Sequence, residues 1–306
     1  MDINSVYIAR RMFKLKIHES DGSAFETLFT RVMGLSNKNF QQVKPQGTYG
    51  DRKNDGFDKT TGTYYQVYAP EDIRKSESEA IKKVARDLEE LINQWNSICP
   101  IKQFYFVIND KYRNLITEIH TVLIELENKY SIKCNTFSSK NLEDIFINLD
   151  EIDIIDIVGH VNIPNLIDEL NYDVLNEVVN YLMNYDFKED SIEKIVPPDF
   201  EKKILFNGLS KKVEGLLNSG YAQTNALEHY FSNNSEFLRN EIKTKLHGLY
   251  LEANDKFNQA SAETSDDKFF YIWEKACPSN KLAIRNTVLV LMGYYFEACD
   301  IFEPPK

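Results

Sequence analysis

The stretch GDRKNDGFDKTTGTYYQVY (50–68) decides how the first half of the chain is interpreted. It begins within a turn-rich segment, 46–62, that contains four glycines. It ends in TYYQVYA (63–69), whose β-branched and aromatic residues are typical of a strand, and Pro70 ends that strand. The stretch therefore predicts a turn followed by a strand, and the segments around it show what kind of sheet this strand joins.

Helix and strand signals alternate on both sides of this stretch. Apolar residues at helical spacing predict helices at 23–34 (with Ser23 as N-cap), 77–95, 114–130 and 140–148. Further strands are predicted at 39–45, 102–110 and 131–137. Such alternation is typical of an α/β domain with a mixed, partly parallel central sheet flanked by helices. The alternating acidic and apolar residues of EIDIIDIV (151–158) predict an edge strand or a connector.

Strand signals fade after about residue 160, and the second half is predicted to be helical. The helix-like segments are 165–186, 200–220, 224–257 and 281–303. Pro197-Pro198 predicts a hinge and Gly220 predicts a helix end. We therefore predict two domains, an α/β domain over residues 1–160 and an all-α domain over residues 161–306.

The charge of the chain is unevenly distributed. Of the formal net charge of −11, none comes from residues 1–150, which carry 21 Lys and Arg and 21 Asp and Glu. Residues 151–306 carry 15 and 26 of these residues. Because phosphate contacts need Lys and Arg, the second half is a poor candidate for a nucleic-acid surface, whereas the first half can still form a basic cleft.

Composition excludes several classes of protein. Hydrophobic residues make up 42% and charged residues 27%, which is typical of a packed chain and not of a disordered one. No apolar run reaches about 18 residues, so no membrane span is expected. The four cysteines form no CxxC pair and are typical of reduced, mostly buried thiols in a cytoplasmic protein. No GxxxxGK[ST] motif is present, so we do not expect the chain itself to hydrolyse ATP.

The residues that suggest chemistry are Glu26, Asp55, Gln66 and Val67. Phosphodiester hydrolysis commonly uses a divalent cation, and Mg²⁺ takes one or two carboxylates with other oxygens. Asp55 would supply the central carboxylate, while the side chain of Gln66 and the carbonyl of Val67 would complete the protein ligands. Glu26, from the preceding helix, would orient a metal-bound water. Gln66 and Tyr68 should share one face of their strand.

This order of residues resembles a known nuclease pattern. Phe25-Glu26, Gly50-Asp51-Arg52-Lys53-Asn54-Asp55 and Gln66-Val67-Tyr68 are similar to the FE…GDGGxD…QxK motifs of the Mrr-like branch of the PD-(D/E)xK nuclease superfamily. The resemblance covers roughly residues 20–110. It implies a restriction-endonuclease-like fold, DNA as substrate, and Mg²⁺ or Mn²⁺ held by Asp55, Glu26 and Val67.

Tyr68 departs from this pattern, because it stands where the family has lysine. That lysine aligns water and stabilises charge in the transition state. A phenol, with an ordinary pKa near 10, is a poor substitute for a cation at neutral pH. We therefore expect a cation from elsewhere, with Lys53 as the first candidate. Arg52, Lys53 and Lys59 are the predicted phosphate contacts.

A second resemblance extends to the C-terminal half. The string GDRKNDGF…YYQVYAPED, together with Pro198-Asp199-Phe200, KILFNGLS (203–210) and YFEACDIFEPP (295–305), resembles effectors of ABC-three-component antiphage systems, the group that includes Lamassu-type defence. The resemblance implies that the helical domain docks on an SMC-like ABC ATPase or its accessory subunit. It also implies that the N-terminal domain attacks nucleic acid when infection is sensed.

Each candidate residue also has a plainer explanation. Asp55-Gly56 is a common turn pair, Glu26 suits the first turn of a helix, and Gln66 is an ordinary strand residue. Their order favours a site, and the leading hypothesis is a metal-dependent DNA endonuclease effector of a bacterial defence complex. The alternative is a nuclease-like domain that has lost cleavage and only docks DNA or assembles the complex. RNA as substrate and homo-oligomerisation on activation stay open.

Overall fold

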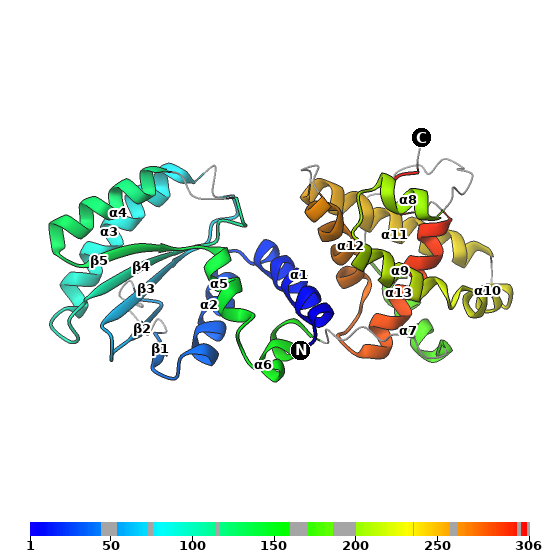
Figure 1. Cartoon of the computed structure of the whole chain (residues 1–306), viewed down its shortest axis with the longest axis horizontal. Helices are drawn as coiled ribbons and strands as arrows, with labels where there is room; N and C mark the ends of the chain where they lie inside the picture. Colours follow the sequence, from blue (N-terminus) through cyan, green and yellow to red (C-terminus); the bar gives the residue numbers. More distant parts are fainter. Residues whose placement is uncertain are drawn as a thin grey trace. The chain divides into compact units, whose positions relative to one another are not determined.

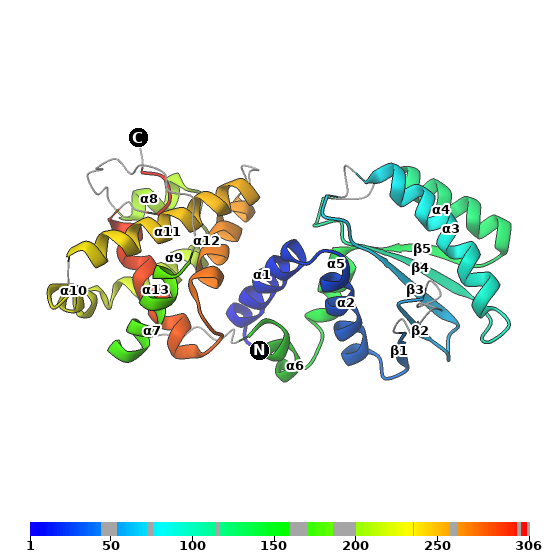
Figure 2. The same cartoon turned by 180° about the vertical axis from the view of Figure 1, so that it is seen from behind.

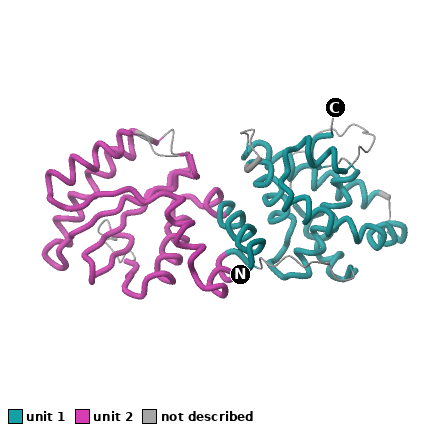
Figure 3. Tube along the Cα trace, viewed as in Figure 1, with its two compact units in different colours: residues 1–15, 158–306 teal, residues 16–157 magenta. Residues whose placement is uncertain are grey.

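The computed structural model describes residues 1–43, 54–72, 76–113, 117–159, 170–185, 200–234, 236–257, 262–298 and 301–304 (Figure 1). Residues 16–157 form one compact unit, and residues 1–15 together with 158–306 form the other (Figure 3). The domain boundary predicted after residue 160 lies close to the end of the first of these units. The first 15 residues, however, group with the C-terminal half, for which the sequence contains no signal.

The unit of residues 16–157 is built on a five-stranded sheet. Its strands follow the chain order β1 (Phe40–Gln42), β2 (Gly56–Asp58), β3 (Thr63–Tyr68), β4 (Gln103–Ile108) and β5 (Lys133–Phe137). The pairs β1–β2 and β2–β3 are antiparallel, whereas β3–β4 and β4–β5 are parallel. The prediction of a mixed, partly parallel sheet is confirmed. Strand β2 lies inside the segment that was predicted to contain only turns.

Helices cover both faces of this sheet (Figures 1 and 2). On one face α3 (Glu77–Trp95) and α4 (Thr117–Tyr130) enclose a cluster that includes Tyr64, Phe104 and Phe106. On the other face α2 (Gly22–Ser36) packs with α5 (Ser139–Phe146). There the ring of Phe29 contacts Tyr65 and Phe137, with both pairs of ring centroids 5.6 Å apart. Tyr64 and Tyr65 anchor different layers because successive strand side chains point to opposite faces.

Two local predictions in this unit are wrong. Residues 151–158 form α6 (Glu151–Val158) and neither an edge strand nor a connector. Ile154, Ile157 and Val158 are buried, and this spacing places them on one face of a helix. The second error concerns α2, which begins one residue before Ser23, so that Asp21 and not Ser23 is its N-cap.

The other unit is helical in all of its described elements. These are α1 (Ile3–Glu19) through residue 15, α7 (Tyr172–Met183), α8 (Phe200–Phe206), α9 (Lys211–Tyr221), α10 (Thr224–Ser232), α11 (Glu236–Lys256), α12 (Ala262–Ala276) and α13 (Leu282–Glu297). The prediction of a helical second half is confirmed for residues 170–304 as far as they are described. Helices α1 and α12 have no predicted counterpart. Pro197-Pro198 lies outside the described residues.

Helix α13 is the centre of this unit, and glycines allow α9 to approach it closely. A Cβ atom on Gly220 would lie 2.1 Å from the carbonyl oxygen of Leu289, and one on Gly293 would lie 2.7 Å from the amide nitrogen of Tyr221. Gly220 is the second-last residue of α9, so it marks a helix end as predicted. Its missing side chain also creates the room for the packing of α9 on α13.

Cys99 and Cys134 are buried and free, and Cys277 is half-buried and free. Within the described ranges, no helix has both the length and the apolar composition needed to cross a bilayer.

Candidate functional site

Asp55 is held in place by the two residues with which the sequence grouped it. The carboxylate atom Oδ2 accepts a hydrogen bond from Nε2 of Gln66 at 2.9 Å and from the backbone N–H of Val67 at 2.5 Å. The backbone of Asp55 bridges two strands, because its N–H donates to Tyr65 and its carbonyl accepts from Val43. Asp55 and Gln66 are 3% and 4% exposed. The carboxylate is therefore fixed at the start of β2, against the end of β3.

The backbone of Val67 also faces Asp55. The carbonyl of Tyr68 accepts a hydrogen bond from the N–H of Asn109, directly after β4. Because successive backbone groups along a strand point to opposite sides, the N–H and carbonyl of Val67 point away from β4, towards the side of β2. The N–H finds Asp55 on that side. The structure thus brings together Asp55, Gln66 and Val67, three of the four predicted metal-site residues.

Buried amide atoms for which the described residues offer no partner are found on Asn54 and Gln66. The side chain of Asn54 is fully buried, and neither Nδ2 nor Oδ1 has a hydrogen-bond partner in the described part of the chain. The same is true of Oε1 of Gln66, whose Nε2 holds Asp55. Each such group costs about 1–3 kcal/mol when it is left unpaired. Asn54 was not among the predicted site residues, although it stands in the quoted string directly before Asp55.

These oxygen atoms suit a hard divalent cation. Mg²⁺ and Mn²⁺ prefer carboxylate, amide and backbone oxygens, and Mg²⁺ commonly keeps several waters. Asp55, Gln66 and Val67 would hold such an ion. Across the residues described by the structure, no three His, Cys, Asp or Glu side chains cluster in a way that would bind a metal. Among the described residues, the further ligands of an ion at Asp55 would therefore have to be neutral oxygen donors.

Glu26 lies on α2, on the opposite side of the sheet from α3 and α4. Its neighbour Phe25 is fully buried, whereas Glu26 itself is half-buried. The backbone carbonyl of Glu26 accepts a hydrogen bond from Oγ1 of Thr30 at 2.9 Å, as is common within a helix. The role predicted for Glu26, orienting a metal-bound water, stays a prediction.

Tyr68 is part of the packed layer beneath α3. Its ring is stacked on Phe106, with centroids 5.9 Å apart and an angle of 18° between the planes. The ammonium of Lys83, on α3, lies 5.9 Å from the centroid of the Tyr68 ring and pairs with Asp87 at 2.5 Å. Burial is the main reason why the pKa of Tyr68 is raised above its ordinary value of 10.0. The phenol is therefore neutral at physiological pH.

The predicted phosphate contacts lie in two places. Lys59 is exposed in the turn of the β2–β3 hairpin, at the opposite end of β2 from Asp55. Lys59 follows Asp55 by four positions, which corresponds to about 13 Å along an extended chain. Arg52 and Lys53, together with Asp51, lie outside the described residues.

Asp58 organises the hairpin turn. Its Oδ1 accepts hydrogen bonds from the N–H and hydroxyl of Thr60, and its Oδ2 accepts one from Asn37. Burial alone would raise the pKa of this carboxyl group, but hydrogen bonds from Thr60 and Asn37 outweigh it and hold the pKa below 3.8. Asp58 is thus a buried carboxylate that holds the turn together.

Two of the C-terminal motifs, KILFNGLS (203–210) and YFEACDIFEPP (295–305), are joined by hydrogen bonds, and we call these contacts the lock. Lys203, which begins KILFNGLS, is 1% exposed and donates from Nζ to the carbonyls of Phe296 at 2.7 Å and Ile301 at 2.6 Å. Asn207 exchanges two hydrogen bonds with the backbone of Glu303, at 2.8 and 3.0 Å. The chain after α13 is thereby tied to α8. These are two of the motifs that carry the second resemblance, and the structure shows that they contact each other.

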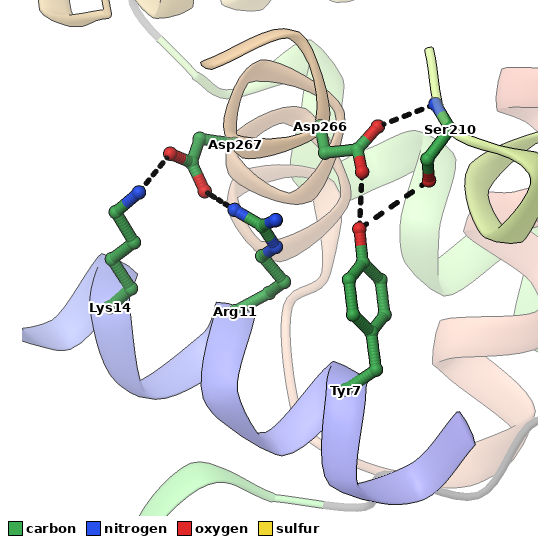
Figure 4. A network of polar contacts seen from close by, with 6 residues as sticks. All are labelled: Tyr7, Arg11, Lys14, Ser210, Asp266 and Asp267. Carbon is green, nitrogen blue, oxygen red and sulfur yellow. Dashed lines mark hydrogen bonds and ion pairs between the residues drawn. The ribbon is translucent and has the colours of Figure 1, made fainter. Parts of the chain in front are cut away.

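A second polar network lies within the same helical unit, and Figure 4 shows its members, Tyr7, Arg11, Lys14, Ser210, Asp266 and Asp267. Three of them occupy one face of α1, and two are neighbours on α12. The hydroxyl of Tyr7 donates to Asp266, while Arg11 and Lys14 pair with Asp267 at 2.9 and 2.7 Å. Burial, followed by the bond to Asp266, raises the pKa of Tyr7 to about 12. This network fixes the first 15 residues on the helical unit.

A cavity of about 610 Å³ lies elsewhere in the sheet unit. Its lining includes Tyr105, Phe137, Asn141, Asp144 and Asp153. It lies on the side of α5, and its described lining contains none of the candidate residues.

Part of the helical unit matches a known family of protein domains. Residues 173–303 match C-terminal domain 10 of the ABC-three component (ABC-3C) systems. The matched segment contains the lock formed by Lys203, Asn207 and the chain after α13, and it supports an ABC-three-component context for the protein. No curated protein and no solved structure matches the chain.

Proposed function

We propose that the protein is a metal-dependent DNA endonuclease effector of an antiphage defence complex of the ABC-three-component type. The sheet unit would cleave DNA, and the helical unit would dock on an SMC-like ABC ATPase or accessory subunit that restrains the activity. The match of residues 173–303 supports the context, and the resemblance of residues 20–110 supports the chemistry.

The observation that carries the proposal is the arrangement of Asp55. Its carboxylate is buried, oriented by Gln66 and Val67, and placed beside the backbone of Val67 at the end of a parallel strand. A divalent cation bound there would neutralise charge on the scissile phosphate and make a water molecule nucleophilic. Asp55 would bind this cation, Gln66 would hold the carboxylate in position, and Glu26 would assist with water.

One observation favours a second candidate function, a nuclease-like domain that binds DNA or assembles the complex without cutting. Tyr68 replaces the lysine of the resemblance, and its ring packs on Phe106 in the core of the domain. If no other cation reaches the scissile phosphate, charge in the transition state is left without a partner. Activity of the endonuclease therefore depends on a cation such as Lys53.

The experiment is a cleavage assay with plasmid DNA and Mg²⁺ or Mn²⁺, using the purified protein alone and together with the products of its neighbouring genes. Asp55→Ala should lower divalent-dependent cleavage by at least about 100-fold, because the cation and the orienting contacts are lost. Asp55→Asn should do the same while it keeps an acceptor for the N–H of Val67. Circular dichroism should show that both variants keep their fold.

Two results would contradict this assignment: cleavage by Asp55→Asn at the wild-type rate, or cleavage that EDTA does not reduce. DNA binding without cleavage in every assembly state would instead support the second candidate. Parallel reactions with RNA identify the substrate class.

A further inference from the structure

Asn54 is a buried polar residue whose side chain forms no hydrogen bond with the described residues. Its side chain is 0% exposed, and both of its polar atoms find no partner among the described residues. Buried polar side chains in native proteins are almost always hydrogen-bonded, and an exception calls for a specific explanation such as a bound ion. The position of Asn54, directly before Asp55, suggests where such an ion would bind.

The same unit contains a buried asparagine with a structural role, Asn109, whose hydrogen bonds can be compared with those of Asn54. Asn109 is 1% exposed, and its Nδ2 donates to the carbonyls of Ile17 and Ser20 at 3.0 and 2.7 Å. Its Oδ1 accepts from the N–H of Lys111 and the hydroxyl of Ser139. Both polar atoms of the Asn109 side chain are hydrogen-bonded, whereas the described residues offer no partner to either polar atom of the Asn54 side chain. The contrast indicates that the side chain of Asn54 binds a ligand and does not stabilise the fold.

A second buried oxygen without a described partner belongs to Gln66, the residue that contacts Asp55. Gln66 uses Nε2 to hold Asp55, which leaves its Oε1 buried and without a described partner. Amide oxygens are hard donors that Mg²⁺, Mn²⁺ and Ca²⁺ accept beside carboxylates. Two amide oxygens and one carboxylate would leave a bound divalent ion with a net positive charge, which attracts an anionic phosphate.

We propose that Oδ1 of Asn54 binds a divalent cation directly, as a ligand in the same site as Asp55 and the Oε1 of Gln66. This inference deepens the proposed function, because it names a further ligand of that site. It concerns binding of the ion and not cleavage, so the two are tested by different measurements.

The test is binding of Mn²⁺ and Mg²⁺ to the full chain, measured by calorimetry and by the rise in melting temperature. Asn54→Ala should lower the affinity for Mn²⁺ by at least about 10-fold. Asn54→Asp keeps the size of the side chain and adds a charged ligand. It should bind Mn²⁺ more tightly than the wild type and melt at a lower temperature without metal, because a carboxylate then lies unpaired beside Asp55.

Asn109→Ala is the matched control, since it removes an equally buried amide from the same unit. It should lower the melting temperature and leave the affinity for Mn²⁺ within about twofold of wild type, because its partners are backbone and hydroxyl groups. If Asn54→Ala does not fold, the opposite effects of Asn54→Asp on metal affinity and on metal-free stability decide alone.

Unchanged affinity in Asn54→Ala, weaker or unchanged affinity in Asn54→Asp, or no binding of either metal by the wild type would overturn the inference. Metal binding that depends on Asn54 in a protein that never cleaves nucleic acid would uphold the inference and contradict the proposed nuclease. Cleavage that needs Asp55 but not Asn54 would support the proposed nuclease and contradict the role of Asn54 as a ligand.

Discussion

The exchange of lysine for Tyr68 changes the chemistry available at a single residue. A lysine at this position would be able to extend a charge towards a phosphate, whereas the ring of Tyr68 is held by its stacking on Phe106. The neighbouring Lys83 is paired with Asp87 on its own helix. In the proposed cleavage reaction, the positive charge would therefore have to come from a residue outside strand β3.

We predict that Lys53 supplies this charge in cleavage. Lys53→Ala should be nearly as inactive as Asp55→Ala, since losing one fixed charge contact costs about 100- to 1000-fold in rate. Tyr68→Phe should keep measurable activity because the ring stack remains, and Lys59→Ala should have a small effect from its distant turn. Single-turnover rates in the assembled complex check all three. Full activity in Lys53→Ala would contradict the assignment of Lys53 as the source of the charge. Activity that appears only on oligomerisation would indicate that a second protomer supplies the cation.

Asp58 gives a prediction for acid stability. Its pKa is held below the ordinary value of 3.8 in the folded protein, so its hydrogen bonds stabilise the fold above about pH 4. This contribution is lost as the pH falls from there through the folded pKa. The free energy of unfolding, measured with urea at about pH 5 and at about pH 3, should fall less in Asp58→Asn than in the wild type. Equal losses in the two proteins would show that the carboxylate is not stabilised by the turn.

Lys203 shows at the scale of elements how one buried charge joins α8 to the chain after α13. Lys203→Met keeps most of the length of the side chain but leaves the carbonyls of Phe296 and Ile301 without their donor. We expect a loss of about 3 kcal/mol in the free energy of unfolding, as is usual for a charged donor. Chemical denaturation measures this loss.

The neighbouring residue provides the control for this prediction. Lys202 is exposed, and Lys202→Met should change the free energy of unfolding by less than about 1 kcal/mol. An equal effect of the two substitutions would mean that the buried ammonium does not hold the motifs together.

Elements with strong periodicity could be predicted from the sequence. Helix α3 was predicted with its observed bounds, because its apolar residues repeat at helical spacing between Ser76 and Asn96. Strand β2 was missed because Gly56, Phe57 and Asp58 look like turn residues, and only pairing with β1 and β3 makes them a strand. For α6 the residues alternate locally, while burial of every third or fourth side chain is decided by packing.

The candidate site could be predicted only in part. Asp55 and Gln66 were grouped because of their order and chemistry in the sequence, and the β2–β3 hairpin, which was not predicted, is what brings the two side chains together. Asn54 could not be singled out, because an unpaired buried amide depends on what the fold places around it. Lys203 looks like any surface lysine in the sequence, and only the return of the chain after α13 buries it.

At the scale of the whole molecule, the uneven charge predicts where DNA binds. Lys59 lies in the neutral half, and Lys59→Glu should lower the slope of log affinity against log salt by about 1, as for one lost phosphate contact. Lys211 is an exposed lysine of the acidic half, with a side chain that is 86% exposed, and Lys211→Glu should leave that slope unchanged. Fluorescence anisotropy with a short labelled duplex measures both.

The reverse order of sensitivity, with Lys211 important and Lys59 neutral, would place DNA on the helical half and contradict the division of roles between the two units. Equal slopes in all three proteins would show that neither lysine contacts phosphate.

The helical unit takes residues from both sides of the sheet unit in the chain, and this has a consequence for biosynthesis. Tyr7 packs on Phe270 and Met12 contacts Arg285, so the first helix leaves the ribosome long before its partners exist. At about 5–20 residues per second, the roughly 150 residues after the sheet unit take about 8–30 s to be made. During that interval the sheet unit has been synthesised, while the apolar face of α1 stays exposed because its partner helices have not yet been made. The nascent protein therefore acquires its sheet unit first and its helical unit last.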